Sequence, residues 1–430
     1  MSRVLVRPSI IRGEVEAPPS KPYTHRVYAA ALLSKGVSRV IRPLKSGDAE
    51  ATRRACVLLG AEVNDLSDGA LVVGGRMKIP EDVINAENSG TTLRLFTAIS
   101  SLAPGGYTIL TGDDSLRRRP MKPLLESLKD LGVECWSSRL NGTAPIIVRG
   151  GGIRGGETKI TGEVSSQFIS ALLYASTKSN HGARIMIEGG LVSKPYVDAS
   201  MEVLRRFGFT VKNEGYELFE VEGCQDGVPC EFKVPGDFSS AAFFMAGAHL
   251  TGGNVEVRGL SLDLPQADSA IIEILKKMGN SLKISQDSVK VDSSSKQGGG
   301  EYCLRDSPDL LPIVAVMAAK SREETIIKGV KHAKLKESDR ISAIASELKK
   351  LGITVESLQD GLKIKGVEKL KGGCVLSPHG DHRMFMALVI LAAATEEGCI
   401  VEDPEVAKIS YPEFLDHARR LGVRIEVLEN

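Results

Sequence analysis

The chain has 430 residues, 42% of them hydrophobic and 25% charged, which is enough apolar material for two or more packed domains. Its 55 Lys and Arg residues nearly balance its 54 Asp and Glu residues, so a net charge of +1 provides no overall field for holding nucleic acid or an anionic membrane. No stretch approaches the roughly 20 apolar residues of a transmembrane helix, and the N-terminus lacks the apolar run of a secretory signal, so we expect a cytoplasmic protein.

One pattern recurs along the chain: a helical turn rich in basic residues, an apolar residue, a glycine and then a β-like run. The first copy reads RRACVLLGAEV and the last reads DHARRLGVRI. The 3.6-residue period before each glycine and the alternation after it predict a helix, a left-handed glycine cap and a strand. The glycines lie 70 to 76 residues apart, at Gly60, Gly132, Gly208, Gly279, Gly352 and Gly422. The sequence therefore predicts an α/β protein of six repeated units, each with two helices and three or four strands, and leaves open whether they form one ring or two lobes.

Basic and hydroxyl residues gather where helices are predicted to begin. Lys21 and Arg26 precede the run VYAAALL, and Gly90 stands among hydroxyl residues before LFTAISSLA, with Arg94 close behind it. Three consecutive arginines ending at Arg119 precede a proline at the next predicted helix start. Helix N-termini present unpaired N–H groups and a positive dipole end, which suit a phosphate or carboxylate. Each segment could equally be an ordinary cap or a solvated turn.

Two more segments of this kind follow in the middle of the chain. Ser165, Ser166 and Gln167 open the predicted helix FISALLYAS, and Ser193 stands in LVSKPY before another helix. Hydroxyl and amide groups at a helix start can cap the helix or bind a phosphate. The residues by themselves do not decide between these uses.

The C-terminal half adds carboxylates to the pattern. Asp309 follows a proline at the start of an apolar helix, and Lys336, Glu337 and Arg340 precede the helix ISAIASELKKL. A carboxyl group held between two cations beside an anionic substrate could transfer protons. The alternative is a charged helix cap with i,i+4 pairs on a solvated face.

The segment HGDHRM raises the question of a metal site. His379 and His382 flank an aspartate and precede Arg383 and the apolar helix MFMALVILAAA. No further His or Cys falls at a matching spacing, and the seven cysteines are scattered without a CxxC pair, so we expect neither a bound metal nor a disulfide framework. Lys408, in VAKISYPEF, is the last basic candidate. If these helix starts converge, they would hold a small molecule with several negative charges.

Taken in order, these motifs resemble those of the 3-phosphoshikimate 1-carboxyvinyltransferase family, one of the enolpyruvyltransferases. The resemblance runs from about residue 10 to residue 420. Its most specific motifs are VSSQF (164–168), LVSKPY (191–196), KESDR (336–340) and DHRM (381–384). They are joined by PSKxxxxR (19–26), NSGTTLR (88–94), RRP (118–120) and AK-x-x-YPEF (407–414).

The resemblance implies a fold of two lobes, each with three βαβαββ units around a pseudo-threefold axis, an inside-out α/β barrel. It implies one lobe of residues 1–17 with 235–430 and an inserted lobe of residues 18–234. The active site is expected in the cleft between them.

The resemblance also implies a reaction: transfer of the enolpyruvyl group of phosphoenolpyruvate to the 5-hydroxyl of shikimate 3-phosphate, with release of phosphate and without a cofactor or metal. Asp309 would deprotonate the hydroxyl, Glu337 would deliver and later remove a proton at the methylene carbon, and Lys21 would contact both substrates. Phosphoenolpyruvate would lie among Lys21, Gly90, Arg119, Gln167, Arg340, Arg383 and Lys408. Shikimate 3-phosphate would be held by Lys21, Arg26, Ser165, Ser166, Gln167, Ser193, Asp309 and Lys336. Arg94 and His382 are further candidates, the expected partners are these small molecules alone, and we expect a monomer.

The chain departs from the family pattern at two positions. Pro22 stands where many members have a serine, and its ring has no hydroxyl or N–H to offer. His332 stands where an asparagine is common, and it could act as a substitute donor or as a pH-sensitive contact. We expect these changes to weaken binding of shikimate 3-phosphate without changing the reaction.

Two other functions compete with this interpretation. The sister enolpyruvyltransferases that act on UDP-N-acetylglucosamine carry a reactive Cys, or sometimes Asp, at the place of Asp114, but KESDR and LVSKPY favour shikimate 3-phosphate. A non-catalytic sensor of anionic metabolites on the same scaffold would not need both Asp309 and Glu337. At Gly90 the resemblance implies competition between phosphoenolpyruvate and a phosphonate such as glyphosate.

Overall fold

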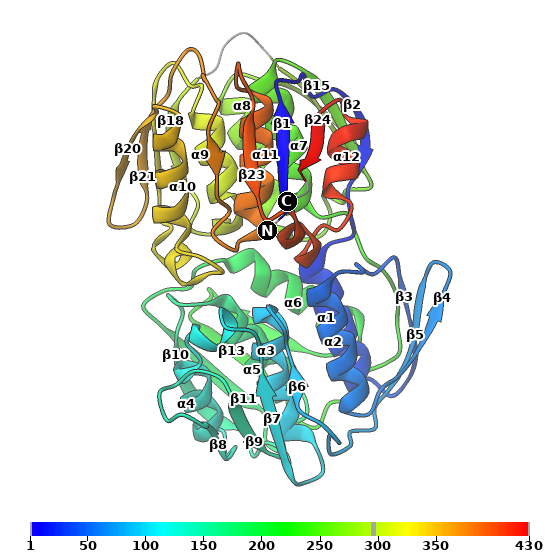
Figure 1. Ribbon diagram of the computed structural model, residues 1–430. Helices are drawn as coiled ribbons and strands as arrows, with labels where there is room; N and C mark the ends of the chain where they lie inside the picture. Colours follow the sequence, from blue (N-terminus) through cyan, green and yellow to red (C-terminus); the bar gives the residue numbers. More distant parts are fainter. Residues whose placement is uncertain (1, 294–297, 429–430) are drawn as a thin grey trace. The chain divides into compact units, whose positions relative to one another are not determined.

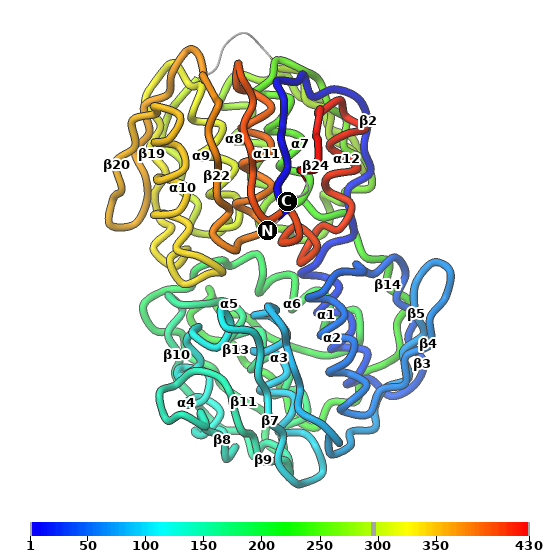
Figure 2. The backbone as a smooth tube through the Cα atoms, viewed as in Figure 1, coloured from blue at the N-terminus to red at the C-terminus, as the bar shows by residue number. Residues whose placement is uncertain are grey.

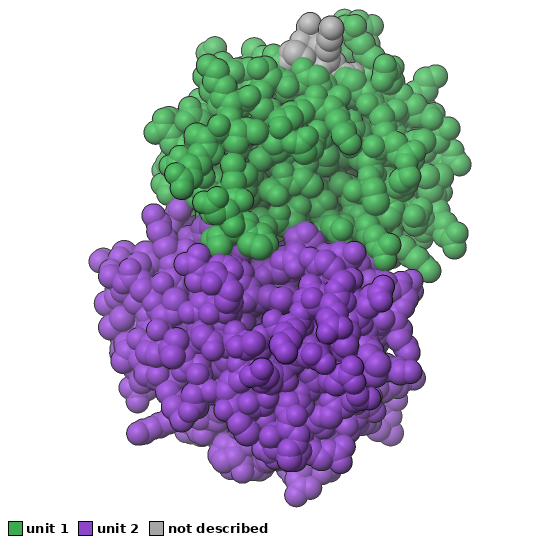
Figure 3. All heavy atoms as spheres, turned by 180° about the vertical axis from the view of Figure 1, so that it is seen from behind, with its two compact units in different colours: residues 1–18, 236–430 green, residues 19–235 purple. Residues whose placement is uncertain are grey.

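The computed structural model describes residues 2–293 and 298–428, whose helices and strands alternate along the whole chain (Figures 1 and 2). The chain folds into two compact units, coloured separately in Figure 3. We call residues 1–18 with 236–430 the terminal unit and residues 19–235 the inserted unit. Within the described ranges, each unit contains three four-stranded sheets and the helices that pack on them.

The elements of the inserted unit follow in chain order. Its helices are α1 (Lys21–Leu33), α2 (Gly47–Leu58), α3 (Gly90–Ile99), α4 (Lys122–Asp130), α5 (Ser166–Ser176) and α6 (Lys194–Arg206). Its strands are β3 (Gly36–Ile41), β4 (Glu62–Leu66), β5 (Gly69–Gly74), β6 (Ile84–Asn85), β7 (Tyr107–Thr111), β8 (Cys135–Ser137), β9 (Ile146–Arg149), β10 (Gly156–Thr161), β11 (Ala183–Glu188), β12 (Val211–Glu214), β13 (Leu218–Val221) and β14 (Glu231–Lys233).

The terminal unit is built from the same kinds of element. Its helices are α7 (Phe238–Thr251), α8 (Ile271–Lys277), α9 (Leu311–Ala318), α10 (Arg340–Lys350), α11 (His382–Ala393) and α12 (Phe414–Arg420). Its strands are β1 (Arg3–Arg7), β2 (Gly13–Glu16), β15 (Asn254–Arg258), β16 (Ser281–Ile284), β17 (Ser288–Asp292), β18 (Gly300–Cys303), β19 (Glu324–Lys328), β20 (Thr354–Ser357), β21 (Leu362–Lys365), β22 (Val375–Leu376), β23 (Cys399–Glu402) and β24 (Arg424–Leu428).

All six sheets share one topology, which confirms the predicted repeat. In β10-β11-β13-β12, the first pair is parallel and the next two pairs are antiparallel. The sheets β14-β3-β5-β4, β6-β7-β9-β8, β2-β15-β17-β16, β18-β19-β21-β20 and β22-β23-β1-β24 follow the same scheme. In the last of these sheets β1 pairs with both β23 and β24, so the first strand of the chain completes the unit that the last strand ends (Figure 1).

The six repeat glycines end helices as predicted. Each has a positive φ, between 77° at Gly208 and Gly352 and 115° at Gly60. After α10, the Gly352 N–H donates to the Lys349 carbonyl and the Ile353 N–H donates to the Leu348 carbonyl. This bonding satisfies the last carbonyls of the helix and turns the chain directly into β20.

Gly352 allows a direct test of this cap. A Cβ there would touch nothing within 4 Å, so an alanine meets only the left-handed backbone, at φ +77°. We expect Gly352→Ala to lower the free energy of unfolding by about 1–2 kcal/mol. Gly352→Asn should cost clearly less, because Asn adopts this conformation more readily. Denaturant unfolding of both variants measures the difference, and equal costs would contradict the cap.

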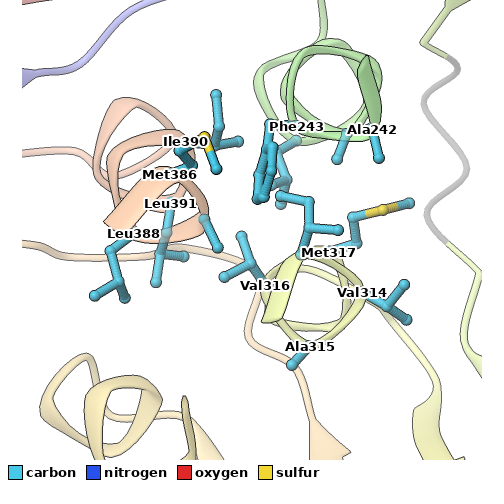
Figure 4. Close-up of a cluster of buried hydrophobic side chains, with 14 of the residues drawn as sticks. Ala242, Phe243, Val314, Ala315, Val316, Met317, Met386, Leu388, Ile390 and Leu391 are labelled. Atoms are coloured by element: carbon cyan, nitrogen blue, oxygen red, sulfur yellow. The ribbon is translucent and has the colours of Figure 1, made fainter. Parts of the chain in front are cut away.

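Three helices form the centre of the terminal unit. Every residue of α9 and α11 is buried, as is α7 from Phe238 to Leu250, because these helices are apolar on all sides. Figure 4 shows their side chains packed together, with Phe243 of α7, Val316 of α9 and Ile390 of α11 in the same cluster. Among the described residues, no helix is long and apolar enough to cross a membrane.

Candidate active site

A buried arginine organises the charged groups of the terminal unit. Arg340 begins α10, and its side chain is only 1% exposed. Its Nη1 donates to Asp309 Oδ1 at 2.7 Å, its Nη2 to Glu337 Oε2 at 2.7 Å and its Nε to Asp381 Oδ2 at 2.8 Å. Arg383, in the first turn of α11, is 2.8 Å from Asp309 Oδ2 through its Nη2. We call these five residues the arginine cluster; it joins the starts of α9, α10 and α11.

The geometry of the cluster explains why Asp309 stays charged. Burial alone would raise the pKa of Asp309, but the charges of Arg383, Lys336 and Arg340 outweigh it and hold this pKa well below its usual range. Lys336 contributes from 3.7 Å, measured from its Nζ to Asp309 Oδ1. The solvated helix cap considered for KESDR is therefore wrong for Arg340, which lies inside the fold among three carboxylates.

Lys408 occupies a different environment. It lies in a 3-10 turn (Pro404–Ile409), 2.6 Å from Glu405, and its side chain is 66% exposed. The cost of breaking such an exposed pair is small. Lys408 is thus available to an anion, whereas the arginines of the cluster are already held by carboxylates.

His332 lies in the turn Lys331–Leu335, beside the cluster, and is buried. Burial, followed by the charge of Lys336, lowers its pKa to about 3. The pH-sensitive contact considered for this position is therefore wrong, because the ring stays neutral above about pH 4.

The low pKa of His332 gives a prediction about pH. In the unfolded chain an unperturbed His protonates near pH 6.5, so the unfolded state binds more protons than the folded state between about pH 6.5 and 3. The contribution of His332 to the free energy of unfolding should therefore be most favourable above about pH 6.5 and should decrease as the pH falls toward 3. We expect its ring NMR signals to stay constant from pH 8 to 5. A midpoint within that range would contradict the burial of a neutral ring.

In the inserted unit, Lys21 is the first residue of α1 and pairs with Asp48 of α2. The distance from its Nζ to Asp48 Oδ2 is 2.9 Å, and both side chains are largely buried. Thr52, one turn further along α2, bonds His25 of α1 at 2.6 Å and Thr92 of α3 at 2.6 Å. This buried hydrogen-bond chain fixes the start of α1 relative to the start of α3.

Gly90 is the first residue of α3 and lies close to a group of polar side chains. Arg94 donates from Nη1 to Gln167 Oε1 at 2.6 Å, and Gln167 Nε2 donates to Thr91 at 2.9 Å. A Cβ on Gly90 would lie 3.1 Å from Arg119 Nη1 and 3.4 Å from Gln167 Oε1. The glycine therefore keeps open the space in front of a guanidinium and an amide.

If phosphoenolpyruvate binds where the motif resemblance implies, Gly90→Ala should raise its KM at least severalfold, because the added methyl occupies this space. The kcat at saturation should change less, and unfolding by denaturant should be little affected because φ at Gly90 is not in the left-handed region. Steady-state kinetics with varied phosphoenolpyruvate measure the effect. Gly47→Ala, at the start of α2 with nothing within 4 Å, is the matched control. An unchanged KM would exclude Gly90 from the phosphoenolpyruvate site.

The remaining candidates of the inserted unit lie at the starts of α5 and α6 or beneath them. Ser165 caps α5 and accepts from Arg94 Nη1 at 3.2 Å, and Ser166 follows it as a buried residue. Ser193 precedes α6 with φ +57° and is buried. Arg26 is buried inside α1, where it donates to Ser200 Oγ at 2.8 Å and to the carbonyls of Pro22 and Tyr196 at 2.9 Å. Two of its five N–H groups therefore tie α1 to α6, and a third is bonded within α1.

Pro22 leaves this local structure intact. It is the second residue of α1, where a missing N–H costs no helical hydrogen bond. Thr24, two residues further on, is buried and donates to the Ser20 carbonyl at 2.9 Å. Among the described residues, no group of three or more His, Cys, Asp or Glu is arranged to hold a metal ion.

The family model described as EPSP synthase (3-phosphoshikimate 1-carboxyvinyltransferase) matches residues 6–418. The chain belongs to the EPSP synthase family. The 3-phosphoshikimate 1-carboxyvinyltransferase of Korarchaeum cryptofilum is 46% identical over 422 residues, 98% of each chain. That of Methanocaldococcus jannaschii is 43% identical over 419 residues, 97% of each chain. The solved EPSP synthase from Acinetobacter baumannii has a TM-score of 0.84 and 27% identity, with full coverage of both chains.

These comparisons confirm the family, fold and activity expected from the motifs. The chain is a transferase of aromatic amino acid biosynthesis: it transfers the enolpyruvyl group of phosphoenolpyruvate to shikimate 3-phosphate in the shikimate pathway. The EPSP synthase relatives extend over nearly the whole chain, which excludes the sensor and the UDP-N-acetylglucosamine enzyme as its primary function.

Several residues that contact or neighbour the motif residues in the structure were not predicted from the sequence. Asp381 was quoted within DHRM but given no role, although it caps α11 and holds Arg340. Asp48 and Thr52 lie in α2, which carries no motif, and only the packing of α2 against α1 brings them to Lys21 and His25. Asp268 is buried, and burial followed by the charge of Asp309 raises its pKa to about 7. An acidic side chain in an unremarkable helix gives no signal in the sequence alone.

Proposed function

We propose that Asp309 and Glu337 carry the proton transfers of the reaction and that Lys21 contacts both substrates. The observation that supports this most directly is Arg340, which holds both carboxylates at 2.7 Å through its two terminal nitrogens. One guanidinium thus holds both side chains in position, with Asp309 as the base and Glu337 as the acid–base group.

The two acids would act at different atoms. Asp309 takes the proton of the 5-hydroxyl of shikimate 3-phosphate, so that the oxygen can bond the central carbon of phosphoenolpyruvate. Glu337, in its protonated form, gives a proton to the methylene carbon; later it takes one back as phosphate leaves the tetrahedral intermediate. Product formation thus returns Glu337 to its protonated form. The proton that Asp309 took from the 5-hydroxyl leaves with the phosphate, so the protons balance without a cofactor.

A substrate would also change the basicity of Asp309. Without substrate, Arg383, Lys336 and Arg340 make Asp309 a weak base by holding its pKa low. A phosphate or carboxylate that binds these cations offsets their charge, so the pKa of Asp309 rises. Asp309 therefore becomes an effective base when the site is filled.

We further propose the binding sets that the motifs imply. Arg119, Gln167, Gly90, Arg340, Arg383, Lys408 and Lys21 bind phosphoenolpyruvate. Lys21, Arg26, Ser165, Ser166, Gln167, Ser193, Asp309 and Lys336 bind shikimate 3-phosphate. The cations supply charge and the helix starts supply N–H groups to phosphates and carboxylates. We also propose a cytoplasmic monomer whose two compact units correspond to the two lobes of the family.

Phosphate release tests the proposal. The purified chain is given phosphoenolpyruvate with shikimate 3-phosphate, or with UDP-N-acetylglucosamine, in buffer containing EDTA. We expect release with shikimate 3-phosphate only. Release that disappears on chelation would contradict metal-free chemistry, and release with the nucleotide sugar would contradict the acceptor set.

A further inference from the structure

Two of the seven cysteines lie beside each other in the terminal unit. Cys374 immediately precedes β22, the edge strand of its sheet, and Cys399 begins the neighbouring strand β23 (Figures 1 and 2). The strands are parallel, and Val375 pairs with Ile400, so Cys374 stands opposite Cys399. Their Sγ atoms are 3.8 Å apart.

This arrangement is compatible with a covalent bond. A disulfide needs Cα atoms about 4.4–6.8 Å apart, and neighbouring strands lie about 4.8 Å apart. Cys374 immediately precedes this two-residue edge strand, and its carbonyl accepts from the Ile400 N–H at 3.0 Å. A small shift of Cys374 would therefore bring the sulfur atoms together without breaking the inner pairs of the sheet.

We propose that Cys374 and Cys399 form an oxidisable pair, which a hydroperoxide converts into an intramolecular disulfide in the folded protein. First, the Cys374 sulfur attacks hydrogen peroxide: the O–O bond breaks, one oxygen stays as a sulfenic acid and the other leaves as water. The Cys399 sulfur then attacks the Cys374 sulfur, the S–O bond breaks, and the hydroxyl leaves as water with the thiol proton. The thiols lose two electrons and the peroxide gains them.

The order of these steps follows from exposure. Cys374 is partly exposed, whereas Cys399 is buried. Burial, followed by the neighbouring Cys374, raises the pKa of Cys399 to about 12, so few of its thiols are ionised and reactive at neutral pH. Peroxide therefore reaches Cys374 first, and Cys399 acts as the resolving thiol.

The bond would enclose α11. Positions 374 and 399 are 25 residues apart, and the segment between them contains the whole of this helix with Asp381 and Arg383. A crosslink across such a loop restricts the unfolded chain more than the folded one. Oxidation should therefore raise the thermal midpoint by roughly 5 °C.

The test uses the folded full-length chain treated with hydrogen peroxide, then alkylated and digested without reduction. We expect a peptide pair linked through Cys374 and Cys399, which dithiothreitol separates, and the higher thermal midpoint. Cys374→Ser and Cys399→Ala should each remove both effects. Cys303→Ser, which removes an exposed thiol of the same unit, should leave both.

Three outcomes would overturn the proposal. Cys374 could proceed to a sulfinic acid while Cys399 remains alkylatable after unfolding, the link could form only in denaturant, or it could join a different cysteine. Because the readouts are peptide mass and thermal midpoint, they do not depend on the assigned catalytic roles.

Discussion

Replacing Glu337 by Gln is expected to reduce kcat by a factor of 10² to 10⁴, the range that general acid–base catalysis contributes. Gln keeps the size of the side chain and an oxygen that can accept from Arg340 Nη2, now 2.7 Å away, but it cannot exchange a proton at the methylene carbon. Binding of shikimate 3-phosphate should change little. Phosphate-release kinetics and calorimetric titration of shikimate 3-phosphate measure the two effects separately.

Two further variants make this result specific. Glu356→Gln changes an exposed glutamate of β20 in the same unit and should leave kcat unchanged. Asp309→Ala should also lower turnover by orders of magnitude, because it removes the base for the 5-hydroxyl. If Glu337→Gln keeps more than a tenth of the turnover, Glu337 is not the proton-transfer group.

Replacing Arg340 by Met should have the largest effect on stability. The change removes the cation that holds Asp309, Glu337 and Asp381 and leaves buried carboxylates without their main partner. Breaking a buried ion pair in this way typically costs 3–5 kcal/mol, so we expect the free energy of unfolding to fall by about that amount at pH 7. Denaturant unfolding measures it, and Arg322→Met, at an exposed arginine of the same unit, is the control.

The pH dependence of this loss provides a second check. In the intact chain the pKa of Asp309 lies well below that of an unfolded Asp, so the stability it contributes is present above about pH 4 and is lost as the pH falls further. In the variant, Asp309 keeps Arg383 and Lys336 but loses Arg340, so its pKa rises and it takes up a proton at a higher pH than in the intact chain. The difference between the two proteins should therefore narrow as the pH falls from 7 toward 4. A constant difference would show that packing, and not charge, dominates the effect.

The repeated architecture and the residues proposed for catalysis could both be predicted from the order of residues along the chain. The six glycine caps could be predicted because a helix end is a local structure, set by residues within one turn of Gly60 or Gly352. Lys21 and Glu337 could be named because their motifs are contiguous and follow one another in a specific order, and Asp309 was named through the family resemblance that these motifs carry.

Which charged side chains lie within bonding distance of one another depends on how the helices pack. The sequence around Arg340 is compatible with a solvated helix cap and also with a buried cation. Its burial depends on α9 and α11, which begin 29 residues before it and 42 residues after it. Asp48 and Asp381 gained their partners in the same way, by the packing of helices whose own sequences are unremarkable. Electrostatic interactions depend on distances of a few ångströms in space, whereas a sequence motif shows only which residues are close along the chain. The low pKa values of Asp309 and His332 could therefore be inferred only from the folded structure.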